Sequence, residues 1–158
     1  MVMLLVYLGL ALGVSFLCSM LESAILSVPP SYVALMAQKG SRSGRWLRGL
    51  KENIDRPLAA ILTLNTVAHT IGAAGVGAQA QMVFGSEWVT LTSIVLTLLI
   101  LVLSEIIPKT LGAVYWRGLS GFVAYALRGM ILVCLPLVVG FEWLSRTVAS
   151  GERKARVT

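Results

Sequence analysis

Four long apolar stretches, separated by short polar segments, make up most of this chain. They cover roughly residues 1–28, 57–84, 88–107 and 118–145. A helix that spans a bilayer needs about 20 predominantly apolar residues, so each stretch is long enough to cross a membrane. The first ends at Pro29, because proline has no N–H to donate and clashes with the preceding turn. The pattern predicts an all-α membrane protein.

The basic residues predict how the first three stretches are oriented. The segment between the first two is the most basic internal loop (Lys39, Arg42, Arg45, Arg48, Lys51 and Arg56). Short loops rich in Lys and Arg stay in the cytoplasm, so the N-terminus is expected outside. The turn around Glu87 has no basic residue and fits the outside, whereas Lys109 places the end of the third stretch inside.

The fourth stretch is ambiguous. Both of its flanks are basic, and Arg128 and Pro136 interrupt it. A single span cannot have both flanks in the cytoplasm, so we expect a broken pair of helices that lies at the cytoplasmic interface or dips into the membrane and back out. The prediction is three transmembrane helices (1–28, 57–84 and 88–107), juxtamembrane helices near 30–54 and 118–147, and a cytoplasmic C-terminus. Four spans with the C-terminus outside is the alternative.

Composition excludes several other classes of protein. Of 158 residues, 57% are hydrophobic and 13% charged, with a mean hydropathy of +0.85, whereas soluble proteins are roughly 25% charged. The net charge of +6 does not indicate nucleic acid, since the basic residues lie between apolar stretches. Cys18 and Cys134 lie inside apolar stretches and show no zinc or disulfide spacing.

Polar residues recur at helical spacing within the first stretch. Ser15, Ser19, Glu22 and Ser23 lie three or four residues apart and so share one helix face. A stripe of oxygen atoms is expected to face the protein interior. The alternatives are that each hydroxyl bonds its own helix carbonyl four residues back, and that Glu22 simply reaches water.

Two further polar patches lie in the second and third stretches. The second stretch carries Asn65, Thr66, His69 and Thr70, and the third ends in Ser104, Glu105, Pro108 and Lys109. Pro108 cannot donate to the carbonyl four residues back, and exposed carbonyls in broken helices build cation sites in transporters. Amides and hydroxyls can instead hold helices together, and Glu105 can pair with Lys109. The lone His69 is expected to make a structural hydrogen bond rather than bind a metal.

Together the three patches offer carboxylates, hydroxyls, an amide oxygen and backbone carbonyls. Such a hard-oxygen set suits Mg²⁺ or Ca²⁺ rather than zinc or copper. No Walker A motif for ATP is present, so ion exchange is the expected source of energy if the ion moves uphill.

Three segments resemble the cyclin-M/CorC magnesium transporters. Residues 105–112 (EIIPKTLG) look like that family's Glu-Ile-Ile-Pro-Lys signature. Residues 19–24 (SMLESA) are similar to its Ser-Gly-Ser-Glu-Thr-Ala segment, and residues 64–69 (LNTVAH) stand where it often reads Gly-Asn-Asn/Thr-Leu-Val-Asn. Met20, Ser104 and His69 depart from the family pattern, which bears on the ligand set.

The resemblance implies a homodimeric transmembrane domain (1–150) of three spans with a belt of juxtamembrane helices. It also implies Mg²⁺ export coupled to Na⁺ entry across the inner (plasma) membrane. Residues 151–158 would then be a linker toward cytoplasmic CBS-pair domains, which bind ATP. The implied Mg²⁺ ligands are Ser19, Ser23, Asn65 and Glu105, with Glu22, Ser104 and Thr66 as second candidates. Small residues four apart, such as Gly9 and Gly13, also predict close helix pairing in a dimer.

Two other functional classes remain open. The chain could be a membrane sensor or scaffold whose output lies in a cytoplasmic domain, in which case the polar patches only hold helices together. An intramembrane Ser/His enzyme is disfavoured, because no Gly-x-Ser-x-Gly or similar context surrounds any serine. We therefore expect no enzymatic activity.

Overall fold

The computed structural model describes the backbone of residues 1–155 and the side chains of 1–137, 139, 140 and 143. Every regular element in this part of the chain is helical, which confirms the predicted fold class. The elements are α1 (Val2–Ser27), α2 (Pro30–Gln38), α3 (Arg42–Glu52), α4 (Asp55–Phe84), η1 (Ser86–Trp88), α5 (Val89–Leu99), η2 (Ile100–Ile106), α6 (Ile107–Val114) and α7 (Trp116–Ala155).

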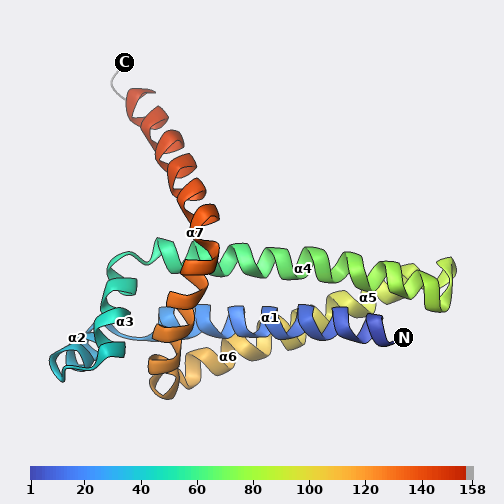
Figure 1. Cartoon of the computed structure of the whole chain (residues 1–158), viewed down its shortest axis with the longest axis horizontal. Helices are drawn as coiled ribbons and strands as arrows, with labels where there is room; N and C mark the ends of the chain where they lie inside the picture. The colour runs from blue at the N-terminus through green and yellow to red at the C-terminus, as the bar shows by residue number, and fades with distance from the viewer. Residues whose placement is uncertain (156–158) are drawn as a thin grey trace.

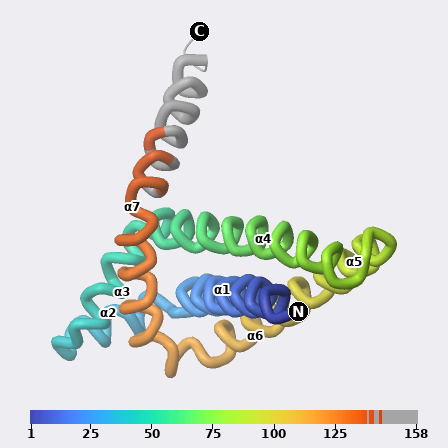
Figure 2. The backbone as a smooth tube through the Cα atoms, turned by 45° about the vertical axis from the view of Figure 1, so that its right-hand side comes forward, coloured from blue at the N-terminus to red at the C-terminus, as the bar shows by residue number. Residues whose placement is uncertain are grey.

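Three long helical segments lie side by side: α1, α4, and the continuous run α5–η2–α6 (Figure 1). α1 and α4 run antiparallel, and α1 lies between α4 and α6 (Figure 2). α2 and α3 gather at one end of this bundle, and η1 turns the chain at the other. At that turn Gly85 has φ of +89°, a conformation that side-chain-bearing residues rarely adopt.

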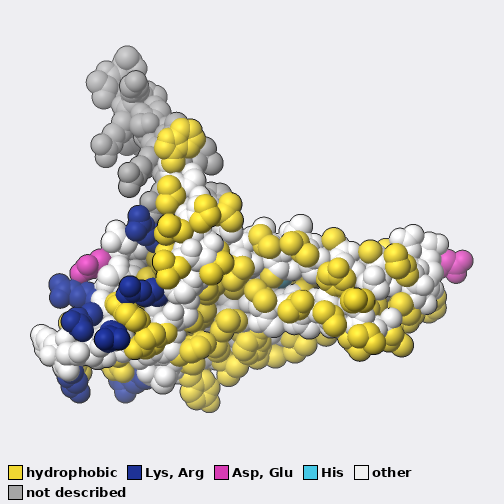
Figure 3. All heavy atoms as spheres, viewed as in Figure 1, with side chains coloured by type: hydrophobic (Ala, Val, Ile, Leu, Met, Phe, Trp, Pro, Cys, Tyr) yellow, Lys and Arg dark blue, Asp and Glu magenta, His cyan; other side chains and the backbone are white. Residues whose placement is uncertain are grey.

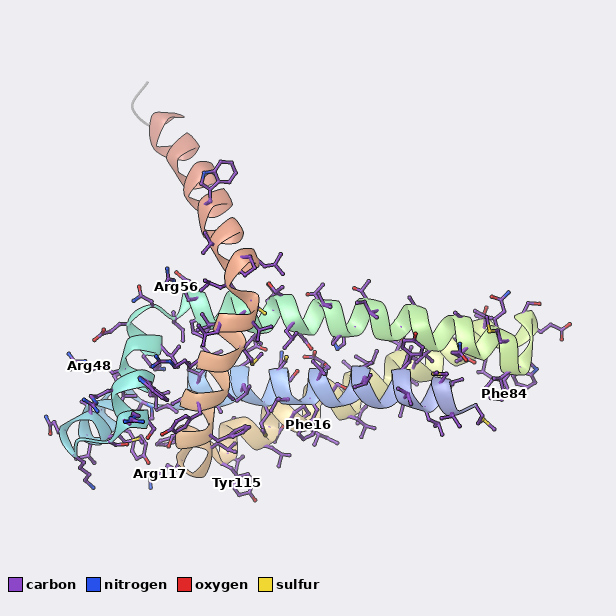
Figure 4. The ribbon with its side chains drawn as sticks, viewed as in Figure 1. Phe16, Arg48, Arg56, Phe84, Tyr115 and Arg117 are labelled. Atoms are coloured by element: carbon purple, nitrogen blue, oxygen red, sulfur yellow. The ribbon has the colours of Figure 1, made fainter. Side chains whose placement is uncertain are left out.

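Charge divides the bundle into two ends and an apolar middle. Figure 3 shows the visible Lys and Arg side chains gathered around α2, α3 and the adjoining part of α7, with hydrophobic side chains covering the length between the ends. Arg48, Arg56 and Arg117 lie at this basic end, whereas Phe84 lies at the opposite end (Figure 4). An apolar belt bounded by polar ends is the surface that a bilayer requires.

The largest buried apolar cluster lies near the basic end. It joins α1 to α3, α4 and α7 through side chains such as Leu21, Ile25, Leu47, Ile61 and Leu127. Lys51 of α3 adds a polar tie, because its Nζ donates to the Ile25 carbonyl oxygen at 3.0 Å. Burial lowers the pKa of the Lys51 ammonium. The surface helices are thus anchored on the end of α1.

α7 differs from the sequence prediction. It runs as one helix from Trp116 to Ala155 with Pro136 inside it, so the predicted pair of broken helices is wrong. Proline removes one N–H from the ladder, and membrane helices tolerate that loss where neighbouring groups or local adjustments of the turn satisfy the freed backbone groups. By length and composition alone, four segments among the described residues are able to cross a membrane, the fourth being Trp116–Leu137. This segment crosses over α1 and α4 rather than running alongside them (Figures 1 and 2).

The segment that precedes α6 is a π-helix. Within η2 the hydrogen bonds reach five residues back, as in the bond from the Ile107 N–H to the Val102 carbonyl. Pro108 follows at the start of α6 and is buried. Proline cannot donate a backbone hydrogen bond, so the regular α-helical hydrogen bonding is interrupted at Pro108. The wider π turn lies directly before this interruption. This irregular segment carries Ser104 and Glu105.

Candidate functional site

The pairing of α1 with α4 brings two polar stripes face to face. Ser15 Oγ of α1 is hydrogen-bonded to His69 Nε2 of α4. One turn further toward the α4 C-terminus, Gly72 lies so close to Ala11 that an added Cβ would overlap the alanine methyl group. The small residues let the helix backbones approach closely, and the Ser15–His69 contact fixes their register.

The same register places Ser19 opposite Asn65. Each lies four residues from the Ser15–His69 pair, toward the basic end, on antiparallel helices. Ser19 Oγ and Asn65 Oδ1 are both buried side-chain oxygens without a hydrogen-bond partner among the described residues. A buried polar atom without a partner costs roughly 1–3 kcal/mol, so two of them in register mark a position that favours a positively charged ligand.

Glu105 approaches these oxygens from the π segment. Its Oε1 accepts a hydrogen bond from Asn65 Nδ2 at 3.2 Å and lies 3.9 Å from His69 Nε2. Because Asn65 uses its NH₂ group as the donor here, its Oδ1 remains available to a ligand. The neighbouring Ser104 is fully buried, and its hydroxyl donates to the Leu12 carbonyl of α1 at 3.4 Å.

Lys109 completes the cluster. Its Nζ lies 3.1 Å from Glu105 Oε2 and 3.4 Å from Glu22 Oε2. The Glu105–Lys109 pair was one of the sequence alternatives, whereas the bridge to Glu22 was not predicted. Two carboxylates and one ammonium leave these three ionisable groups with a net charge of −1. The side chains are 24% exposed at Glu105, 33% at Glu22 and 45% at Lys109, so the exposed fraction increases from Glu105 to Lys109.

Close packing of α6 on α1 fixes Lys109 in this position. Ser23 Oγ donates a hydrogen bond to the Lys109 carbonyl oxygen. At Gly112 an added Cβ would overlap the Met20 carbonyl oxygen and lie 3.0 Å from the Ala24 amide nitrogen. The glycine therefore allows α6 to contact the α1 backbone directly, which keeps Glu22 and Lys109 within reach of each other.

The sequence left open that each serine hydroxyl donates to the carbonyl four residues back in its own helix. The serines on the inner face do not do so. On α5, Ser93 and Thr97 donate to carbonyls four residues back in the same helix. Ser15, Ser23 and Ser104 instead bond groups on another helix. The polar stripe of α1 thus faces the protein interior, as its helical spacing indicated.

The structure brings together most of the residues that the sequence singled out. Ser19, Asn65 and Glu105 lie at the centre. Around them, Ser23 and Glu22 contact Lys109, and Ser104 donates to the Leu12 carbonyl. Thr66 is exposed, because one residue along a helix rotates the side chain away from the face that Asn65 presents. His69 makes a structural hydrogen bond, as predicted, but its partner Ser15 was not foreseen, although both residues lie at helical spacing from predicted site residues.

The chemistry of this cluster suits a hard cation. Among the described residues, no group of three or more His, Cys, Asp or Glu side chains could hold a metal, so a cation site here would depend on neutral oxygens as well as carboxylates. Hydroxyl, amide and carboxylate oxygens favour Mg²⁺ and Ca²⁺ over softer transition metals. The single imidazole already has a hydroxyl partner.

Comparison with known proteins identifies related membrane proteins. A family model described as the cyclin M transmembrane N-terminal domain matches residues 6–158. A UPF0053 protein of Synechocystis is 34% identical over 139 residues, which cover 88% of this chain and 40% of that relative. The UPF0053 inner membrane protein YfjD of Escherichia coli is 24% identical over 127 residues, covering 80% of this chain and 29% of that protein.

A plant protein also matches. A chloroplastic DUF21 domain-containing protein of Arabidopsis thaliana is 30% identical over 130 residues, covering 82% of this chain and 20% of that protein. The chain therefore spans at most 40% of the length of these three relatives. The similarity covers the membrane helices and the polar cluster between them.

Proposed function

Because the chain belongs to the cyclin M transmembrane family, we propose that it binds Mg²⁺ between α1, α4 and the η2–α6 segment and exports the ion in exchange for Na⁺. One observation carries the proposal. Two buried oxygens without partners, Ser19 Oγ and Asn65 Oδ1, lie in register beside the Glu105 carboxylate. Both oxygens lie within the membrane helices, where a polar group without a partner costs free energy. Binding of a cation would supply that partner.

The proposed ligand set follows from which oxygens are free to accept. Glu105 supplies the charge, and Ser19 and Asn65 supply neutral oxygens from the other two helices. The Ser23 hydroxyl donates a hydrogen bond to the Lys109 carbonyl oxygen, so its lone pairs remain available to a cation. Mg²⁺ takes about six oxygens near 2.0–2.1 Å and usually retains several waters, so retained water would complete the shell.

Lys109 acts in this proposal as an internal competitor for the site. Its ammonium now neutralises part of the charge of Glu105 and Glu22. A dication that binds Glu105 repels this ammonium, which would then shift toward Glu22 and the more exposed end of the cluster. Ion binding and the position of α6 are thereby linked, and alternating access requires a link of this kind.

Export needs an external source of energy. Moving one charge across 100 mV is worth about 2.3 kcal/mol, so expelling a dication against an inside-negative potential costs roughly twice that before any concentration gradient. Entry of Na⁺ down its own gradient releases free energy, which can drive the export of Mg²⁺. The graded exposure from Glu105 to Lys109 supports loading from the basic end, which the positive-inside rule assigns to the cytoplasm.

We further propose three spans, with α7 lying at the cytoplasmic interface. Its path across α1 and α4 (Figure 1) and the charge of Arg128 near the middle of its apolar segment support this topology over four spans. Cysteines introduced singly at Gly118 and Leu137, after replacement of Cys18 and Cys134, should react with an impermeant maleimide from the same side. Reaction from opposite sides would establish a fourth span.

The active unit is proposed to be a homodimer within a longer protein that carries cytoplasmic CBS-pair domains. Gly72 packs against Ala11 within the protomer, whereas a Cβ added at Gly9, Gly13 or Gly77 would have no described atom within 4 Å. The open glycines therefore offer surfaces for a second copy. Light scattering in mild detergent should give the mass of two chains, and a monomer would contradict the proposal.

An ion-flux assay tests the transport proposal directly. The purified chain in Mg²⁺-loaded proteoliposomes should release Mg²⁺ faster when Na⁺ is supplied on the opposite side than with choline. Glu105→Gln should abolish release, and Ser93→Ala, which removes a hydroxyl bonded only to its own helix, should not. A membrane sensor or scaffold would instead give no Na⁺-dependent flux in any of these proteins.

A further inference from the structure

A pocket lies at the basic end, where α3 packs against α7. It has a volume of about 280 Å³ and is lined by two arginines, one indole and aliphatic side chains, among them Arg45, Trp46, Leu50, Arg128, Ile131 and Leu132. None of its lining residues is acidic. We propose that this Arg45–Arg128 pocket binds the phosphate headgroup of an anionic membrane phospholipid.

The two arginine side chains differ in the contacts that they make. The Arg128 guanidinium lies 4.2 Å from the centroid of the Trp46 ring, and the Trp46 ring packs edge-on against Tyr125 at 4.9 Å. A guanidinium stacked on an aromatic face keeps its N–H groups free to bind an anion in the ring plane. Arg45, the residue directly before Trp46 on α3, is exposed, and none of the side-chain hydrogen bonds or ion pairs found among the described residues involves it.

A nearby arginine shows the contrast. Arg48, also on α3, donates to Glu52 at 2.9 Å, so its charge is already neutralised within the protein. Arg45 and Arg128 have no such carboxylate in their shared pocket. Two like charges that face one pocket repel each other unless an anion lies between them, so the pocket has an electrostatic preference for a phosphate or a similar group.

The aliphatic half of the pocket identifies the source of that phosphate. Ile131 and Leu132 line it beside Arg128, and Leu132 and Val133 are 64% and 77% exposed on the same helix. Figure 3 shows basic side chains directly adjoining hydrophobic ones where α7 meets α3. A free phosphate gains nothing from an apolar wall, whereas a phospholipid places its acyl chain beside its headgroup. Basic pockets between helices at the cytoplasmic face of membranes are suited to anionic lipids.

Quenching of Trp46 fluorescence tests this assignment in a bilayer. The chain is prepared with Trp88, Trp116 and Trp143 replaced by Phe and placed in vesicles of phosphatidylcholine that contain a few per cent of spin-labelled lipid. Labelled phosphatidylglycerol should quench Trp46 at lower mole fraction than labelled phosphatidylcholine. Arg45→Gln and Arg128→Gln should each lower this preference by about fivefold, and Arg128→Lys by less, since each basic group near the surface contributes a modest attraction.

Controls separate lipid binding from folding and from soluble anions. Arg48→Gln removes an equal charge from the same helix outside the pocket and should keep the preference. Signals are normalised to each variant in unlabelled vesicles, and Arg45→Gln disturbs no described contact. Equal quenching by both labelled lipids, an unchanged preference in both Gln variants, or displacement by millimolar glycerol 3-phosphate would each overturn the proposal. The last result would identify a soluble phosphate site.

Discussion

Replacing Glu105 by Gln should remove most Mg²⁺ affinity while the helix bundle stays intact. Glutamine keeps the shape of the side chain and one carbonyl oxygen as a ligand. The Asn65 amide can still donate to that oxygen, and Lys109 retains Glu22 at 3.4 Å. The net charge of Glu22, Glu105 and Lys109 together rises from −1 to zero, so the substitution acts chiefly through charge.

The expected size of the effect follows from Coulomb's law. A dication about 2.1 Å from a carboxylate oxygen gains about 4 kcal/mol even at the dielectric constant of water. This corresponds to roughly 1,000-fold in the dissociation constant. Glu105 is 24% exposed, so the local dielectric is below that of bulk water and the figure is a lower bound on the charge term.

Isothermal titration with MgCl₂ at constant ionic strength measures this change in the dissociation constant. The matched control is Glu87→Gln, which removes the same charge from the exposed turn at the opposite end of the bundle. Circular dichroism and light scattering should report unchanged helicity and assembly for both variants. A loss of less than tenfold in Glu105→Gln, or an equal loss in Glu87→Gln, would refute the reasoning. Glu22 would then be the next candidate for the ligand.

Other substitutions test the surrounding geometry. Ser19→Ala and Asn65→Ala should each weaken Mg²⁺ binding by roughly tenfold in the same titration, because water can replace one neutral ligand; no loss in either would argue against the paired oxygens. Lys109→Met should tighten binding by about fivefold or more, since it removes a repulsive charge held 3.1 Å from Glu105, and weaker binding would contradict its role as a competitor. Gly112→Ala should lower stability by about 1–3 kcal/mol through overlap with α1, seen as a lower Tm, whereas Gly118→Ala has open space and should not.

Sequence patterns were sufficient to predict the helical class and the ends of the first two apolar helices, whereas the third continues past the predicted end at residue 107 to Val114. Pro29 and Gly85 mark two of these ends because their backbone chemistry acts locally. The continuity of α7 was not predictable in this way. The local cost of Pro136 is one hydrogen bond and a steric clash, whereas packing of α7 against α3 and α4 acts over many turns, and no local pattern reports it.

The site was predictable as three polar patches but not as a set of contacts. Helical spacing indicates that Ser15 and Ser19 share a face, yet only the register of α1 on α4 pairs them with His69 and Asn65. That register depends on close approach at Gly72, which is a tertiary property. The i to i+4 pairing of Glu105 with Lys109 is local and was foreseen; the bridge from Lys109 to Glu22 joins distant segments and was not.

The division of the site among three helices also bears on how the protein enters the membrane during its synthesis. α1 brings one carboxylate, α4 brings neutral polar groups, and the third segment brings Glu105 already neighboured by Lys109. Each helix is therefore apolar enough to leave the translocation channel into lipid on its own, since one or two charged residues near a helix end add only a modest insertion cost. The charged groups meet only when the inserted helices associate within the bilayer. No nascent helix has to carry the complete set of proposed cation ligands through the hydrocarbon layer.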